Sequence, residues 1–226
     1  MTVSHQAAYS AKQSAKNRAV SIHPFTPAEL RKRKKLESNI FDWLEYFYPE
    51  SFYNPWTDNQ REMVSAIFHC AKYGNTQAIA APRGEGKTTL GECAITYSLL
   101  TGLMTFPLIV AAAGEHSDRI LSNIKSELEF NENLGDEETG LYRDVCTPIR
   151  ALEGAPQRCN MQTVGGERTQ MKWSGGFIKF PTISEDYWKS IGQPKGYKYR
   201  CGGSILMTRG LDAAMRGIRM DRDWET

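Results

Sequence analysis

The chain lacks the features that would tie it to a metal cluster, a disulfide framework or a membrane. Its five cysteines are scattered and odd in number, and none forms a Cys-x-x-Cys pair. This pattern argues against a disulfide scaffold and a zinc site, and it favours a reducing, cytosolic setting. No apolar run approaches the length of a membrane span, and the N-terminus lacks the apolar core of a signal peptide.

A strong net charge and internal repeats are also missing. The 226 residues are 40% hydrophobic and 24% charged, which is typical of one soluble globular domain. A net charge of +2 does not by itself indicate a nucleic-acid-binding protein. The charge is unevenly spread, because residues 1–40 contain eight Lys or Arg against only Glu29 and Glu37. The remaining residues are therefore net acidic.

The first part of this basic region predicts a flexible basic arm over residues 1–25. It is rich in Ala, Ser, Gln and Lys and has no apolar period. A solvated, disordered arm is the default interpretation, and contact with DNA or a protein partner is the alternative.

The domain is expected to begin at residue 26 and to run to residue 226. Thr26-Pro27-Ala28-Glu29 is a capping box with proline at the first helical position. The basic run 31–35 then lies near the start of the predicted helix, where positive charge is unfavourable beside the helix dipole. Either an anionic partner or a plain solvated face would account for it. The apolar stripe of this helix consists of Leu36, Ile40, Leu44 and Phe47.

The most informative stretch is residues 80–89, Ala-Ala-Pro-Arg-Gly-Glu-Gly-Lys-Thr-Thr. It fits the phosphate-binding pattern [GA]-x-x-x-x-G-K-[ST]. Gly84 and Gly86 allow the backbone to turn so that consecutive N–H groups converge on phosphates. Lys87 can reach the β- and γ-phosphates, and the Thr88 hydroxyl can ligate Mg²⁺. The predicted nucleotide contacts of the loop are Gly84, Glu85, Gly86, Lys87, Thr88 and Thr89. A glycine turn that binds nothing is the alternative.

The surroundings of this loop match its expected context. Residues 77–81 are apolar and predict a buried strand before the loop. A helix is predicted after it, ended by Gly102, and residues 106–113 predict a second buried strand followed by another helix. This order predicts a parallel sheet with helices on its faces. The helical stripes are Leu90, Ala94, Tyr97 and Leu100, and then Ile120, Ile124 and Leu128.

Upstream of the loop, Thr57-Asp58-Asn59-Gln60 is a second capping box and opens a helix that places Met63, Ile67 and Ala71 inward. Gln60 follows an aromatic connector and precedes the predicted loop strand. In helicase-like ATPases a glutamine placed this way reads the adenine edge. A purely helix-capping role is the alternative.

The second half of the chain gives weaker signals. A short helix is predicted around residues 141–149, a hairpin over 172–179 and a strand over 204–208. Residues 184–202 interleave aromatic and basic side chains, which suits contact with a nucleic-acid backbone together with base stacking. A surface loop with packed aromatics is the alternative. The interleaved residues are Tyr187, Trp188, Lys189, Lys195, Tyr197, Lys198, Tyr199 and Arg200.

In combination, these residues resemble the front part of a phage large terminase subunit, the ATPase that packages DNA into a procapsid. Arg83 stands four residues before Lys87, as is usual in terminases. The segment 108–125 is similar to the second strand and following helix of the family, and Gln60 matches its adenine motif. Residues 216–219, Arg-Gly-Ile-Arg, resemble the family's Arg-Gly-x-Arg stretch.

The chain also departs from the family. An ATPase of this class needs an apolar strand ending in Asp-Glu, with the Asp supporting Mg²⁺ and the Glu orienting the attacking water. No such run is present, and neither are the carboxylates of the terminase nuclease domain. Asp212, Asp221, Asp223 and Glu225 lack an apolar strand and are not assigned catalytic roles.

The resemblance implies a P-loop NTPase fold of the RecA-like (ASCE) type, a three-layer α/β/α arrangement with a mostly parallel sheet, incomplete at its C-terminus. It implies ATP and Mg²⁺ as cofactors, Arg83 and Lys87 as catalytic residues, and Gln60 at the adenine. It also implies coupling of ATP hydrolysis to translocation of double-stranded DNA, and a homo-oligomeric motor in the host cytoplasm. Its expected protein partners are the procapsid portal and the small terminase subunit. A helicase-like DNA-dependent ATPase and a non-catalytic nucleotide- or DNA-binding module are the alternatives.

Overall fold

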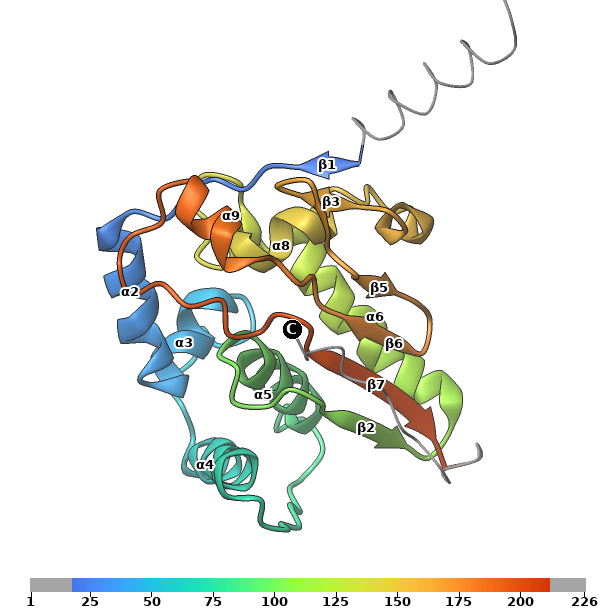
Figure 1. Cartoon of the computed structure of the whole chain (residues 1–226). Coiled ribbons are helices and arrows are strands. Elements are labelled where there is room, and N and C mark those ends of the chain that lie inside the picture. The colour runs from blue at the N-terminus through green and yellow to red at the C-terminus, as the bar shows by residue number, and fades with distance from the viewer. Residues whose placement is uncertain (1–17, 212–226) are drawn as a thin grey trace, which may run out of the picture.

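The structure, a computed structural model, describes residues 18–211 (Figure 1). The helices in this range are α2 (Pro27–Glu37), α3 (Ile40–Phe47), α4 (Asp58–Tyr73), α5 (Lys87–Leu100), α6 (Gly114–Phe130), α7 (Glu132–Gly135), α8 (Arg143–Arg150), the 3-10 turn η1 (Pro156–Cys159) and α9 (Glu185–Ser190). The strands are β1 (Ala19–Val20), β2 (Leu108–Ala111), β3 (Thr163–Val164), β4 (Glu167–Arg168), β5 (Lys172–Trp173), β6 (Phe177–Lys179) and β7 (Ile205–Gly210). The described part of the chain is therefore mixed α/β.

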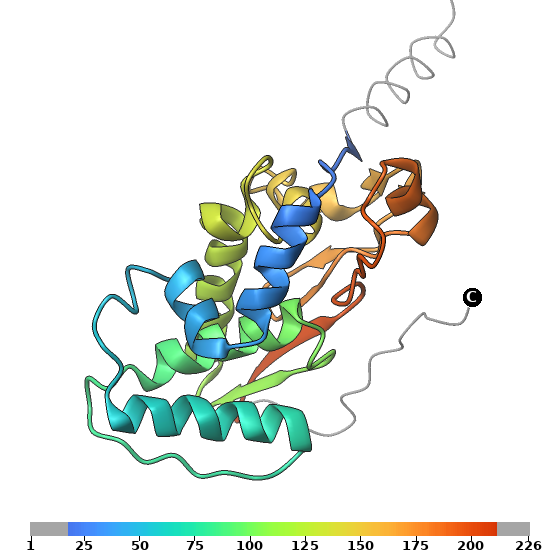
Figure 2. The same ribbon diagram turned by 90° about the vertical axis from the view of Figure 1, so that its left-hand side faces the viewer.

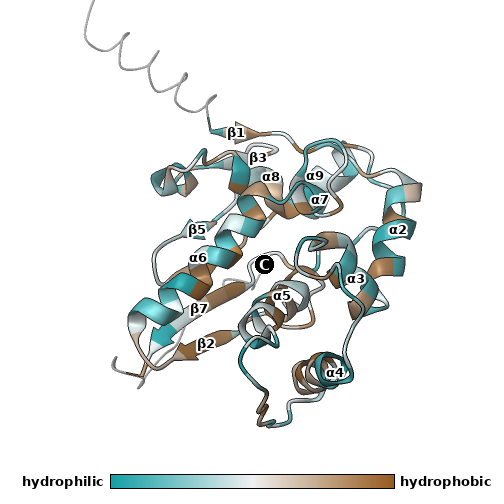
Figure 3. Ribbon diagram, turned by 180° about the vertical axis from the view of Figure 1, so that it is seen from behind, coloured by the Kyte–Doolittle hydropathy of each residue, from teal (hydrophilic) through white to brown (hydrophobic). Residues whose placement is uncertain are grey.

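The larger sheet has the strand order β2-β7-β6-β5. β2 and β7 are parallel, whereas β7 with β6 and β6 with β5 are antiparallel. α6 packs against β7 and β2, and α5 lies on the same side of the sheet as α6 (Figure 2). Hydrophobic residues run along β2 and β7, while much of the outer surface of α6 is hydrophilic (Figure 3). A smaller sheet, β1-β3-β4, lies beside it.

The expectation of a mostly parallel sheet is not met within residues 18–211. The larger sheet is mixed, because the predicted 172–179 hairpin supplies β5 and β6, and β6 then pairs antiparallel with β7. The hairpin predicted over residues 172–179 is thus confirmed, and so is the strand predicted at 204–208, which forms most of β7.

The strand predicted at residues 77–81 is wrong. The segment has no ladder partner among the described residues and forms no strand, and the side chain of Ile79 is 37% exposed. A strand is stable only when a neighbour pairs its backbone N–H and C=O groups. Among residues 18–211, β2 pairs only with β7, and residues 77–81 do not pair with the free edge of β2.

The second predicted strand is shorter and more exposed than expected. Of residues 106–113, only Leu108–Ala111 form β2, and Ile109 is its buried side chain. Leu108 and Val110 are 38% and 41% exposed, because β2 is an edge strand of the described sheet.

The helix predictions near the loop are confirmed. Both capping boxes form, at Thr26 with Glu29 and at Thr57 with Gln60. Leu90, Ala94, Tyr97 and Leu100 of α5 are all buried. The helix expected from residue 26 is divided, however, because Asn39 accepts a hydrogen bond from the backbone N–H of Phe41 and starts α3.

Residues 18–25 are packed onto the domain, although they fall within the predicted arm. β1 pairs with β3, and the side chains of Ile22 and Phe25 are buried. The tyrosine hydroxyl of Tyr187 accepts a hydrogen bond from the Ile22 N–H at 2.9 Å. The prediction of a flexible arm stays open for residues 1–17 alone, which lie outside the described range.

Glu29 holds the start of α2 against α8, and part of the stability that it contributes is expected to be lost in acid. Its carboxylate makes a bidentate pair with Arg143, with both N···O distances at 3.0 Å. Partial burial opposes ionisation of Glu29, but the hydrogen bonds from Arg143 and Thr26 outweigh it and lower the carboxyl pKa below 4.5.

A lowered pKa in the folded state stabilises the fold above the unfolded pKa of about 4.5, and that stability is lost as the pH falls through the folded value. We therefore expect Glu29→Gln to reduce the fall in the free energy of unfolding below pH 4.5. Urea unfolding of both proteins across the acid range measures the difference. Parallel pH profiles would contradict this role of Glu29.

Candidate functional site

The phosphate-binding pattern forms a turn directly before α5. Gly84 and Gly86 both have positive φ, +93° and +75°, and Gly86 is the N-cap residue of α5. A Cβ added at either position would meet nothing within 4 Å. The glycines are therefore required by their left-handed backbone rather than by a close neighbour.

Lys87 closes this turn from the first position of the helix. Its ammonium group donates hydrogen bonds to the backbone carbonyls of Ala81 and Pro82, each at 2.6 Å. The ammonium charge of Lys87 thus lies over the loop, next to the N-terminus of α5. Two neutral carbonyl oxygens leave the positive charge uncompensated, so an anionic oxygen would be a stronger partner.

The start of α5 is open to such an anion. No side chain within residues 18–211 caps it, and its first turn contains no acidic residue. The free N–H groups of a helix start carry partial positive charge and bind phosphates well. Arg83, Thr88 and Thr89 are exposed beside it, and Glu85 is half-buried. The structure thus brings the loop residues predicted from the sequence into one turn.

Gln60 is engaged in capping its own helix. Its side-chain oxygen accepts from the Thr57 N–H at 3.2 Å, and its own N–H donates to the Thr57 hydroxyl at the same distance. The capping interpretation of Gln60 is therefore confirmed, while its predicted contact with adenine is untested. α4 itself lies close to the loop, because Met63 and Ala66 line a small cavity of about 160 Å³ together with residues 77–82.

Four carboxylates near the C-terminus lie outside the described residues, as does the 216–219 stretch: Asp212, Asp221, Asp223 and Glu225. Within residues 18–211, no group of three or more His, Cys, Asp or Glu side chains could hold a metal ion. In the same range no helix has both the length and the apolar character needed to cross a bilayer.

The aromatic residues of the 184–202 stretch are packed inward. Tyr187 and Trp188 are 9% and 5% exposed, and the Tyr197 ring lies 5.1 Å from that of Trp188 and 5.7 Å from that of Phe25. The interpretation as a loop with packed aromatics is thus confirmed. The basic residues between them stay at the surface.

Sequence reasoning missed a buried ionic network that joins α2, α8 and this loop. Asp144 is fully buried and accepts hydrogen bonds from Arg33 Nη1 and from the Tyr197 hydroxyl, both at 2.8 Å. Burial disfavours the Arg33 charge, but the nearby Asp144 outweighs it and the arginine pKa is raised. Burial and the same carboxylate raise the pKa of Tyr197. The only sequence signal is the Arg33–Glu37 pair at helical spacing.

Comparisons of the chain with models of protein families, with curated proteins and with solved structures found no match in any of the three.

Proposed function

We propose that this chain binds a nucleoside triphosphate, ATP by resemblance, at the loop formed by residues 81–89. The observation that carries the proposal is the ammonium of Lys87 held over a turn with two left-handed glycines, at the uncapped start of α5. Each part is a known element of phosphate binding, and the three occur together in the order that the P-loop pattern requires.

In this proposal the loop holds phosphates and does little covalent chemistry. The N–H groups of Gly84 to Lys87 would donate to phosphate oxygens, and Lys87 would exchange its carbonyl partners for the β- and γ-phosphates. Thr88 would be a ligand of the Mg²⁺ that accompanies ATP and neutralises its charge. Arg83 would stabilise charge that develops on the γ-phosphate. Gln60 would need to leave its cap in order to reach adenine.

The fuller proposal is an ATPase that moves double-stranded DNA, as in a large terminase subunit. It rests on the resemblance of the loop, of residues 108–125 and of residues 216–219. A second candidate is nucleotide binding without hydrolysis, which is favoured by the lack of an apolar run ending in Asp-Glu in this sequence. Turnover by the 226-residue chain, with and without duplex DNA, separates the two, and a strand-separation assay identifies a helicase.

The test of the site itself is Lys87→Ala. We expect it to weaken ATP binding roughly tenfold to a hundredfold, because a hydrogen bond to a charged group contributes about 1.5–3 kcal/mol. Binding of a fluorescent ATP analogue, with and without Mg²⁺, measures the loss. Lys72→Ala, which removes an exposed lysine of α4, is the matched control and should bind as the parent does. Equal affinity of Lys87→Ala and the parent would refute the site.

A further inference from the structure

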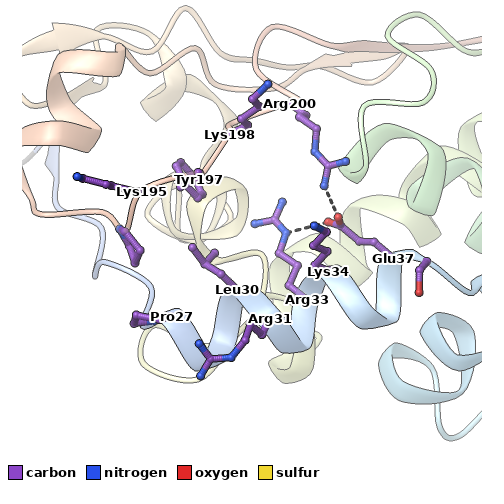
Figure 4. A pocket seen from close by; sticks show the side chains of 13 residues that line it. Pro27, Leu30, Arg31, Arg33, Lys34, Glu37, Lys195, Tyr197, Lys198 and Arg200 are labelled. Atoms are coloured by element: carbon purple, nitrogen blue, oxygen red, sulfur yellow. Dashed lines mark hydrogen bonds and ion pairs between the residues drawn. The ribbon is translucent and has the colours of Figure 1, made fainter.

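A second, larger groove lies between α2 and residues 194–200. It has a volume of about 800 Å³, and we call it the α2 groove. One wall is formed by side chains of α2 and the other by side chains of the loop, and Figure 4 shows Leu30 and Arg33 of α2 opposite Tyr197 of the loop. The two walls include residues of the basic run 31–35 and of the aromatic and basic stretch 184–202, which are far apart in the sequence.

The α2 groove carries four exposed cations that have no ion-pair partner among the described residues. Arg31 and Lys34 lie on the α2 wall, and Lys195 and Lys198 lie on the loop wall. None of the four side chains has a hydrogen bond or an ion pair with another residue in the range 18–211. Like charges that line one groove repel one another in the absence of a counter-charge, so the arrangement becomes more favourable when an anion is bound there.

The acidic residue that lines the groove does not neutralise these cations. Glu37 is already engaged, because its Oε1 accepts from Arg33 at 2.9 Å and from the Tyr142 hydroxyl at 3.0 Å. Its Oε2 pairs with Arg200 (Figure 4). The net charge of the groove is therefore strongly positive.

Arg33 adds a further donor that is not satisfied by any residue in the range 18–211. Its side chain is 5% exposed and lines the groove, and its Nη2 is buried with no hydrogen-bond partner. A buried donor without a partner is costly, and an oxygen of a bound anion would satisfy it.

The kind of anion follows from what the groove lacks. Proteins that bind single strands present aromatic rings on which bases stack. Here the ring of Tyr197 is packed against Phe25 and Trp188, so the loop offers charge without a stacking surface. Cations spread along two walls suit a continuous row of phosphates in a duplex, which is contacted without reading its sequence.

We propose that the α2 groove binds the sugar-phosphate backbone of double-stranded DNA. The choice of DNA over RNA rests on the proposed function, whereas the choice of a duplex backbone rests on the groove. The groove is separate from the nucleotide loop, because Arg200 lies against Gly102, just after the end of α5, and the loop lies at its start. Fourteen helical residues separate the two by about 20 Å.

The experiment measures binding of a labelled 20-base-pair duplex to the full chain by fluorescence anisotropy across a range of salt concentrations. The variant is Lys34→Ala/Lys198→Ala, which removes one cation from each wall. Log K falls with log salt, and each phosphate contact contributes about 0.9 to the magnitude of that slope. The double variant should therefore have a slope that is shallower by roughly 2. Two duplexes of unrelated sequence should bind equally.

Lys72→Ala/Lys172→Ala is the matched control, because it removes the same charge from exposed lysines outside the groove. It should keep the parent slope, and far-UV circular dichroism should show both variants folded. An unchanged slope in the groove variant, or tighter binding of single-stranded DNA than of the duplex, would overturn the proposal. Tighter binding of duplex RNA would overturn the assignment to DNA. Lys87→Ala should still bind the duplex, so a failure of the proposed nucleotide site can be told apart from a failure of the α2 groove.

Discussion

Replacing Asp144 by alanine is expected to lower the free energy of unfolding by about 3–5 kcal/mol. Asp144 is completely buried, and its carboxylate is the partner of Arg33, which is 5% exposed. Removing the carboxylate leaves a guanidinium in a low-dielectric interior with less compensation, and a buried charge without its partner is strongly destabilising. The Tyr197 hydroxyl loses its acceptor in the same step.

Chemical denaturation measures this loss as a lower midpoint at an unchanged slope. Glu153→Ala is the matched control: it breaks the Glu153–Arg158 ion pair, whose side chains are 73% and 51% exposed. An exposed pair contributes about 0–1 kcal/mol, so the control should unfold close to the parent. Arg33→Met/Asp144→Leu removes both charges and should be less destabilised than Asp144→Ala. A loss in Asp144→Ala no larger than in the control would contradict the argument.

The same carboxylate links stability to the α2 groove. Through Arg33 it holds one wall, and through Tyr197 it holds the other. The positions of the charged residues on the two walls therefore depend on Asp144, although Asp144 is buried and does not contact a ligand in the groove itself. Asp144→Ala, studied at a temperature at which it is folded, should weaken duplex binding even though it makes the protein more positive.

Elements with local signals could be predicted from the sequence. The capping boxes at Thr26 and Thr57 and the buried stripe of α5 depend on residues within one or two turns of each other, and all three are confirmed. The strand at residues 77–81 failed because a strand requires a partner. Its apolar composition is compatible with a strand, yet composition does not show which edge would pair with it.

The two candidate sites also differ in how far they could be predicted from local sequence. The nucleotide loop is contiguous, so its residue types and spacing indicated Gly84, Gly86 and Lys87 directly. The α2 groove joins residues 31–34 to residues 194–200, and no local pattern says that these segments face each other. The sequence showed each stretch as basic, and the fold makes them the two walls of one groove.

Replacing Trp43 by alanine is the other substitution with a large expected effect, a loss of about 3–5 kcal/mol in the free energy of unfolding. The side chain is fully buried, its ring contacts those of Phe47 and Tyr97, and its indole N–H donates to the Tyr142 hydroxyl at 3.0 Å. Alanine leaves a cavity among aromatic rings that cannot collapse into it, and it orphans the Tyr142 hydroxyl on that side.

Trp43→Phe keeps most of the ring volume and should lose clearly less, while Tyr53→Ala, at a side chain that is 77% exposed, should change stability by less than about 0.5 kcal/mol. Denaturant unfolding of the three variants orders them, and a loss below about 1 kcal/mol for Trp43→Ala would contradict the packing argument.

Because Trp43 packs against Tyr97 of α5, the helix whose first residue is Lys87, the cavity loosens the element that positions the nucleotide loop. ATP binding should therefore weaken in Trp43→Ala under conditions where the protein is folded, and remain at the parent level in Tyr53→Ala.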